Sequence, residues 1–325
     1  MNKKIRIGVL GTANIAMRSV VPILNSLKDK FEFIGVATRD PSKVDYPDYN
    51  IVKGYDALIE QTNLDAVYIP LPNAMHYEWV KKSLEKGLHV LVEKSLACNY
   101  EEVKELNFLA RQKDLVLLEN FQFRSHSQLK TIREILDNGV IGEIRIVRST
   151  FCFPPFPDKT NIRYRKDLGG GALLDAGTYP VKLSQLLLGK ELEVTSAVLN
   201  FDEDLGVDIW GGAFLKQKNG SLFSQIAFGF DNYYQCNLEV VGSKGKLYTN
   251  RIFTAKEDFT PTLFLETNSE GLKEVNLKAD NHFKNMLIYF YTCVIGDSIN
   301  REEEYDNNIS QAYLLQELRS KAIES

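Results

Sequence analysis

Apolar and polar positions alternate in blocks over the first third of the chain. Ile5 to Leu10 is a short apolar run, which predicts a buried strand. Further strands are expected at Phe31 to Thr38, Asp65 to Ile69, His89 to Val92 and Leu115 to Leu118, and helices at about Asn14 to Lys28, Met75 to Lys86 and Tyr100 to Lys113. This order of strand and helix predicts a parallel sheet with helices on both faces.

The pattern changes after about residue 120. Longer strand-like stretches, several of them separated by Gly and Asn turns, predict a large, mostly antiparallel open sheet. They are Glu143 to Phe153, Leu192 to Phe201, Ile209 to Lys216, Ser221 to Phe230 and Tyr234 to Val241, with helices at Gln128 to Leu136, Ala172 to Leu188, Asn281 to Ile295 and Ser310 to Ile323. We therefore expect an α/β chain with domains at 1–121 and 122–325, in which the helix near 310–323 packs back on the first domain.

Composition excludes several classes of protein. The chain has 325 residues and a formal net charge of −4, so no basic footprint for nucleic acid is present. It has neither an apolar run long enough to span a bilayer nor a signal-peptide pattern, which predicts a cytoplasmic location. Its four cysteines and four histidines have no metal-ligand spacing, so we expect free buried thiols and no metal.

A phosphate-binding turn is expected directly after the first strand. Gly11-Thr12-Ala13-Asn14-Ile15-Ala16 has small residues where a dinucleotide fingerprint has three glycines. Gly11 permits the tight turn, Ala13 lets the backbone approach a diphosphate, and Ala16 permits close packing of helix on strand. The amides of the helix that follows then bind the diphosphate. A simple strand-to-helix turn is the alternative.

The end of the second strand favours NADP over NAD. NAD enzymes usually place an acidic residue there, whereas this chain has Thr38-Arg39. A hydroxyl and a guanidinium suit a 2′-phosphate. Asp40 follows, so an acidic contact to the ribose stays open, as does a solvated turn.

Two further segments carry candidate catalytic groups. Glu93-Lys94 ends the fourth expected strand, at the edge where α/β sheets bind ligands, although a surface ion pair is the ordinary explanation. Three glycines at 169–171 precede a helix and permit close approach of a ligand. Asp175 and Tyr179 lie four residues apart on that helix, and Pro180 predicts a break or kink there.

These segments resemble the Gfo/Idh/MocA oxidoreductases over the whole chain. The resemblance also includes Tyr68-Ile69-Pro70-Leu71-Pro72-Asn73 and Glu119-Asn120-Phe121-Gln122-Phe123, and within the family it is greatest to the NADPH-dependent sugar 3-ketoreductases. It implies a Rossmann domain followed by an α/β domain whose open sheet often forms a dimer or tetramer. Ser95 stands where the family usually has proline, which restores a backbone donor beside Lys94.

The resemblance implies roles for particular residues. Lys94, Tyr179 and Asp175 are the expected catalytic residues. The expected cofactor contacts are Gly11, Thr12, Ala13, Asn14, Ile15, Thr38, Arg39, Pro70, Leu71, Asn73, His76, Glu93 and Lys94, and the expected substrate contacts are Asn120, Arg163, Asp175 and Tyr179.

Our hypothesis is that NADPH reduces a ketone of a sugar, specifically a nucleotide-linked keto-deoxyhexose. Tyr179 would protonate the oxygen and Lys94 would polarise the carbonyl. Two alternatives stay open: oxidation of a free sugar such as an aldopentose with NADP⁺, and a non-catalytic NADP-binding protein. The sequence identifies neither the sugar nor its nucleotide carrier.

Overall fold

The computed structural model describes residues 3–296 and 298–324, which divide into two compact units. The first unit contains the described residues of 3–121 and 283–309, and the second contains those of 122–282 and 310–324. The chain first passes between units at 121/122, the position expected from the sequence. The C-terminal segment divides differently from our expectation, because residues 310–324 cluster with the second unit and residues 283–309 with the first.

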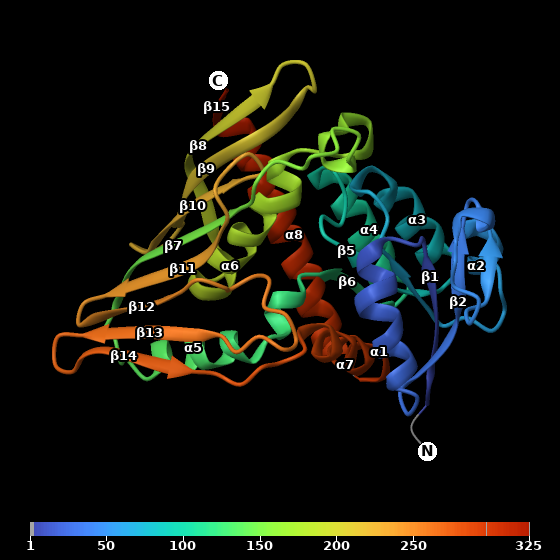
Figure 1. Cartoon of the computed structure of the whole chain (residues 1–325), viewed down its shortest axis with the longest axis horizontal. Helices are drawn as coiled ribbons and strands as arrows, with labels where there is room; N and C mark the ends of the chain where they lie inside the picture. Colours follow the sequence, from blue (N-terminus) through green and yellow to red (C-terminus); the bar gives the residue numbers. More distant parts are fainter. Residues whose placement is uncertain (1–2, 297, 325) are drawn as a thin grey trace. The chain divides into compact units, whose positions relative to one another are not determined.

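The first unit is built on a six-stranded parallel sheet in the order β3-β2-β1-β4-β5-β6 (Figure 1). Its strands are β1 (Ile5–Leu10), β2 (Phe31–Thr38), β3 (Ile51–Lys53), β4 (Ala66–Ile69), β5 (His89–Glu93) and β6 (Leu117–Asn120). Its helices are α1 (Val21–Ser26), α2 (Tyr55–Ile59), α3 (Asn73–Glu85), α4 (Tyr100–Gln112), α7 (His282–Ile295) and the first half of α8 (Ser298–Lys321). The predicted Rossmann-like sheet is confirmed, and the sequence analysis missed β3 and α2.

Burial explains why α7 belongs with the first unit. Met286, Leu287 and Phe290 are at most 2% exposed and share one apolar core with strands β1, β2 and β4. The first half of α8 is held in the same unit by a polar contact, in which Asn308 Nδ2 donates to Asn107 Oδ1 of α4 at 3.0 Å. The second half of α8 has its own anchors in the second unit, where Gln311 Nε2 donates to the Thr178 carbonyl oxygen at 2.9 Å.

The second unit contains a nine-stranded sheet in the order β14-β13-β12-β11-β7-β10-β9-β8-β15. The pairs β7/β10 and β8/β15 are parallel and the others antiparallel, which confirms the mostly antiparallel open sheet. The strands are β7 (Ile144–Cys152), β8 (Leu192–Asp202), β9 (Val207–Gln217), β10 (Phe223–Gly229), β11 (Gln235–Gly242), β12 (Gly245–Thr249), β13 (Thr262–Thr267), β14 (Gly271–Asn276) and β15 (Ala322–Glu324). The helices α5 (Ser127–Asp137) and α6 (Thr178–Leu188) complete the unit.

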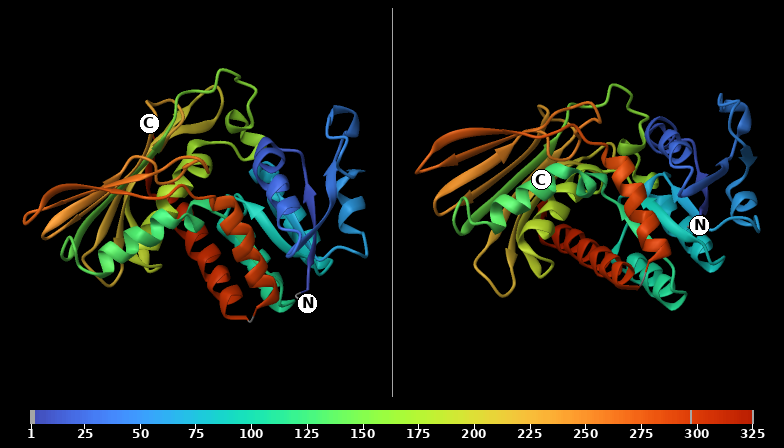
Figure 2. Two further views of the ribbon diagram at one scale, coloured as in Figure 1. Left: turned by 60° about the horizontal axis from the view of Figure 1, so that its bottom comes forward. Right: turned by 90° about the horizontal axis from the view of Figure 1, so that it is seen from below.

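One face of the nine-stranded sheet is covered and the other is open. Helix α6 packs against β7 and β10, and Figure 2 shows the twist of the sheet beside its helices. Along β9 and β10 alternate side chains are buried, whereas Trp210 and Phe214 are 41% and 44% exposed. This alternation is that of a sheet with one packed face.

A π-helical turn, Leu173–Gly177, leads directly into α6. The sequence analysis expected an irregularity at Pro180, whose ring nitrogen cannot donate within the helix. The structure places the irregularity in the turn before Pro180, where it contains Asp175. Such π-helical turns are frequent at functional sites.

Candidate active site

The expected phosphate turn has the backbone conformation that the motif requires. Gly11 has φ +111°, and a Cβ there would lie 2.8 Å from Leu71 Cδ2. Ala16 is fully buried, whereas Asn14 and Ile15 are exposed at the start of the helix. The turn therefore stands at a helix N-terminus, the position at which a dinucleotide diphosphate binds. Thr12 and Ala13 are half-buried in the same turn.

The residues after β2 bear on the choice between NADP and NAD. Arg39 is exposed, and Thr38 is buried beside it. Asp40 is engaged within its own turn, where it accepts hydrogen bonds from Ser42 N at 3.2 Å and Ser42 Oγ at 2.6 Å. Lys43 Nζ lies 3.5 Å from the second Asp40 oxygen. The acidic group is therefore already engaged within its own turn, and the exposed Arg39 lies directly before it.

The loops that follow β4 and β5 are joined by His76. Its ring is fully buried, with Nδ1 2.7 Å from the Ser95 carbonyl oxygen and Nε2 2.7 Å from the Leu71 carbonyl oxygen. Burial lowers the pKa of His76 to about 4. His76, which the resemblance implies as a cofactor contact, lies between these two loops and contacts both of them.

The loop that contains Lys94 is also held by Asn73. The Lys94–Ser95 peptide bond is cis, and the Ser95 N–H donates to Asn73 Oδ1 at 3.2 Å. The backbone donor that serine restores is therefore used. Pro70 and Leu71 lie in the neighbouring loop, between β4 and α3, and both are buried.

Glu93, the residue before Lys94, is bound by two neighbouring strands. Tyr68 Oη donates to Glu93 Oε1 at 2.7 Å, and Asn120 Nδ2 donates to the same oxygen at 2.6 Å. Burial raises the pKa of the Glu93 carboxyl, while these two hydrogen bonds and the charge of Lys94 oppose that rise. Tyr68 was missed as a site residue, although it begins one of the segments that carry the resemblance. Asn120, which we expect at the substrate, is fully buried in this structure and donates to Glu93.

In the second unit, Tyr179 lies within a cluster of aromatic rings. It is 7% exposed, and its ring centroid is 5.0 Å from Phe151, 5.6 Å from Phe253 and 5.8 Å from Phe123. Gln122 Nε2 donates to Tyr179 Oη at 3.4 Å. Packing against the three phenylalanine rings fixes the ring of Tyr179. The hydroxyl group is therefore the part of this side chain that can exchange one hydrogen-bond partner for another.

Asp175 is bound to Arg163. Arg163 Nε donates to Asp175 Oδ2 at 2.6 Å, and the guanidinium lies 4.8 Å from the centroid of the Phe156 ring. Charge-assisted bonds of this kind fix the direction of a carboxylate. We expected Arg163 at the substrate, and the structure makes it the partner of Asp175.

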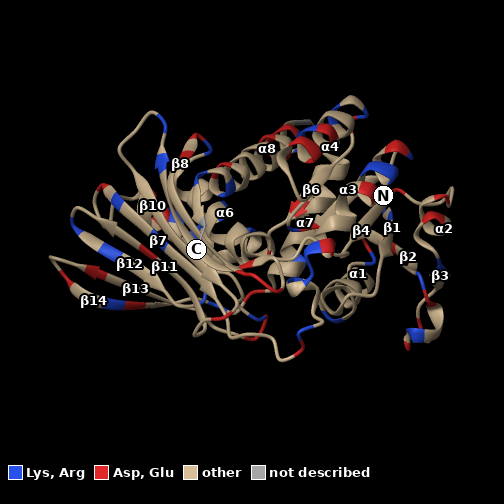
Figure 3. Ribbon diagram, turned by 90° about the horizontal axis from the view of Figure 1, so that it is seen from above, with Lys and Arg blue, Asp and Glu red and all other residues tan. Residues whose placement is uncertain are grey.

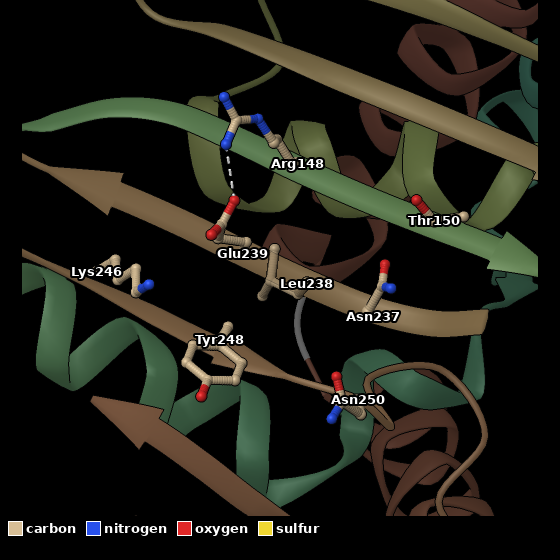
Figure 4. Close-up of a pocket in the computed structure, with 8 residues that line it drawn as sticks. All are labelled: Arg148, Thr150, Asn237, Leu238, Glu239, Lys246, Tyr248 and Asn250. Atoms are coloured by element: carbon tan, nitrogen blue, oxygen red, sulfur yellow. Dashed lines mark hydrogen bonds and ion pairs between the residues drawn. The ribbon is translucent and has the colours of Figure 1, made fainter. Parts of the chain in front are cut away.

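The second unit also has a surface hollow, which is lined by other residues than those predicted for the active site. It has a volume of about 430 Å³ and is formed by β7, β11, β12 and the residue after β12 (Figure 4). Its lining residues are Arg148, Thr150, Asn237, Leu238, Glu239, Lys246, Tyr248 and Asn250. None of them is a predicted site residue, and an ion pair of 2.8 Å joins Arg148 to Glu239. Figure 3 shows charges of both signs along the neighbouring strands β12, β13 and β14.

Within residues 3–296 and 298–324, no three His, Cys, Asp or Glu side chains are grouped to hold a metal ion. Among the helices in that part of the chain, none is long and apolar enough to cross a bilayer. All four cysteines are free; Cys152, Cys236 and Cys293 are buried and Cys98 is half-buried.

Comparison with known proteins identifies both halves of the chain. Residues 5–121 match the model described as the oxidoreductase family with an NAD-binding Rossmann fold, and residues 129–248 match the GFO/IDH/MocA C-terminal domain. The dTDP-3,4-didehydro-2,6-dideoxy-alpha-D-glucose 3-reductase of Actinomadura kijaniata is 38% identical over 322 residues, which are 98% of this chain and 96% of the relative. The NADP⁺-dependent D-xylose 1-dehydrogenase 2 of Haloferax volcanii is 28% identical over 91% of this chain and 92% of the relative.

Solved structures give the same result. The crystal structure of KijD10, a 3-ketoreductase from Actinomadura kijaniata, in complex with NADP and TDP-benzene matches with a TM-score of 0.93 and 35% identity over 99% of each chain. Variants of KijD10 have also been solved with these ligands, one with a tyrosine replaced by phenylalanine and others with a lysine replaced by glutamate or alanine. The expected family is thereby confirmed.

Proposed function

Because the chain belongs to the GFO/IDH/MocA oxidoreductase family, we propose that it is an NADPH-dependent reductase of a nucleotide-linked keto-deoxyhexose, acting at C-3. The observation that carries this proposal is similarity over 98% of the chain to a dTDP-sugar 3-reductase. The xylose dehydrogenase is also similar over most of its length, but at 28% identity. The reductase is therefore the better supported of the two enzymatic hypotheses.

The residues of the first unit fit NADPH. The glycine turn and the exposed start of the following helix would bind the diphosphate, and Arg39 would bind the 2′-phosphate. The engagement of Asp40 with Ser42 and Lys43 favours NADP, because an acidic side chain free to bind a ribose 2′-hydroxyl is the feature of NAD enzymes. The loops joined by His76 would form the remaining contacts, including Pro70, Leu71 and Asn73.

Two side chains would perform the acid catalysis. When bound, NADPH supplies the hydride that is added to the carbonyl carbon. Tyr179 would donate its hydroxyl proton to the carbonyl oxygen, and Lys94 would stabilise the negative charge that develops on that oxygen. The KijD10 variants at a tyrosine and at a lysine support this pair of residue types.

The neighbouring residues would hold these groups and the sugar. The three phenylalanine rings and Gln122 fix Tyr179, so little conformational freedom is lost when the substrate binds. Asp175, directed by Arg163, would accept a hydrogen bond from a sugar hydroxyl. Glu93, bound by Tyr68 and Asn120, would fix the backbone from which Lys94 extends.

The open face of the nine-stranded sheet supports a homo-oligomer. Val198, Trp210 and Phe214 are each more than 40% exposed there. Aromatic pairs lie on the same face, with centroids 6.5 Å apart for Phe214 and Phe223 and 4.8 Å apart for Tyr248 and Phe264. An apolar patch of this kind is typical of an interface, and we propose that a second copy of the chain covers it.

The four free thiols support a reducing compartment, and we propose that the protein is located in the cytoplasm.

A substrate panel tests the assignment. NADPH oxidation is measured with dTDP-linked 3-keto-2,6-dideoxyhexose, and NADP⁺ reduction is measured with free aldopentoses and aldohexoses. We expect turnover with the keto-sugar and none with free sugars. Turnover with a free aldose alone would favour the dehydrogenase, and NADPH binding without any turnover would favour a non-catalytic protein.

A further inference from the structure

A buried carboxylate caps the helix that contains Asp175 and Tyr179. Asp208, near the start of β9, is 6% exposed, and its Oδ2 accepts a hydrogen bond of 2.5 Å from the Leu173 N–H. The backbone of Ala172 is a second partner of this carboxylate. These amides belong to the first turn of a helix, where N–H groups have no partner within the helix.

The local sequence provides no cap at this helix start. Ala172 stands at the capping position and has no side-chain acceptor, so the cap comes from a residue 35 positions further along the chain. A negative charge at this end also interacts favourably with the helix dipole. Burial raises the pKa of Asp208, whereas the amide hydrogen bonds and the charge of Arg319 oppose that rise.

Gly171 makes room for the carboxylate. It has φ +112°, and a Cβ at this position would lie 2.3 Å from Asp208 Oδ1. The glycines before the helix were expected to let a ligand approach the backbone. Here the group that Gly171 admits is the Asp208 side chain, so this position is part of the capping arrangement.

We propose that Asp208 is a positioning residue for the reaction, an inference that rests on the proposed role of Tyr179. Its carboxylate fixes the first helical turn, and thereby the directions in which Asp175 and Tyr179 extend two and six residues after Leu173. Asp208 acts through these side chains and contacts no reacting atom. Small displacements of a catalytic group cost large factors in rate, so loss of the cap slows the chemical step.

Two variants disturb the cap in different ways. Asp208→Asn keeps the shape but replaces one acceptor oxygen by an NH₂ group, which faces backbone donors. Gly171→Ala keeps the carboxylate and displaces it with a Cβ. We expect each to lower the single-turnover rate of NADPH oxidation about 10- to 100-fold at saturating keto-sugar. The NADPH dissociation constant stays within twofold of wild type, because the first unit binds the cofactor.

A double-mutant cycle distinguishes positioning from a purely structural role. On a Tyr179→Phe background, Asp208→Asn has little further effect on the rate if it acts through the tyrosine. The matched control is Val240→Ala, a fully buried position on β11, which is separated from β9 by β7 and β10. We expect it to lower the melting temperature and to leave the single-turnover rate unchanged.

The outcomes separate the two proposals. Wild-type rates in both cap variants would overturn the positioning role, and an Asp208→Asn effect of equal size with and without the Tyr179 hydroxyl would overturn the claim that Asp208 positions Tyr179. A control that slows the reaction as much as the cap variants would do the same. A wild-type rate in Tyr179→Phe alone would instead contradict the proposed acid catalyst.

Discussion

At the scale of single residues, buried polar side chains position the groups that we assign to the chemistry. Glu93 illustrates this, because three neighbouring strands contribute to one cluster: Tyr68 from β4, Glu93 from β5 and Asn120 from β6. The sequence analysis identified the Glu93-Lys94 pair, with a surface ion pair between the two as the alternative explanation. Only the sheet order brings the tyrosine and the asparagine to the carboxyl group.

The pKa of Glu93 predicts a dependence of stability on pH. Burial raises this pKa in the folded protein above its ordinary value of 4.5. The folded state then binds the proton more tightly than the unfolded chain, so the free energy of unfolding falls as pH rises from about 4.5 through the folded pKa. A neutral side chain of the same shape at position 93 removes this loss of stability at high pH.

We therefore expect Glu93→Gln to melt at a higher temperature than wild type at pH 8. At pH 4 the difference should vanish, since both side chains are then neutral. Thermal unfolding monitored by circular dichroism at the two pH values measures it. The same melting difference at both pH values would show that ionisation of Glu93 does not affect stability.

At the scale of elements, strong hydrophobic periodicity was enough to predict helices and strands from the sequence. Short or exposed strands and features that depend on long-range contacts were not predicted. The buried parallel strands and the helices Asn73–Glu85 and Tyr100–Gln112 lie within a few residues of the predicted ranges. The strand Ile51–Lys53 is only three residues long, and Gly271–Asn276 is mostly exposed, so neither has a pattern that predicts a strand. The helix cap formed by Asp208 was not predicted for another reason: its partners are distant in sequence.

The loops after β4 and β5 provide a prediction at this scale. Replacing His76 with Gln removes the ring that lies between the Leu71 and Ser95 carbonyl oxygens and loosens both loops. We expect the NADPH dissociation constant, measured by fluorescence titration, to rise about tenfold, as the loss of one buried hydrogen bond implies. Tyr77→Phe, on the same helix as His76, is the matched control, since it removes hydrogen bonds with Glu105 of α4 and with Lys81 and leaves the His76 contacts in place. Equal effects of the two substitutions would exclude a specific role for the His76 link.

At the scale of the whole molecule, the open face of the nine-stranded sheet determines the expected assembly. We expect Trp210→Glu and Phe214→Glu each to lower the molar mass in sedimentation equilibrium toward that of one chain, because each introduces a charge into an apolar face. Phe108→Glu, at a position 67% exposed on α4 of the other unit, should leave the mass unchanged. A wild-type protein that sediments as a single chain would contradict the proposed interface.

The central claim is that Tyr179 and Lys94 act together on a sugar ketone. The most direct measurement is the single-turnover rate of NADPH oxidation by Tyr179→Phe and Lys94→Met, each mixed with saturating dTDP-linked 3-keto-2,6-dideoxyhexose. We expect both rates to fall at least about 100-fold, the lower range for removal of a positioned acid catalyst, while both variants still bind NADPH. Wild-type rates in both variants would contradict the account.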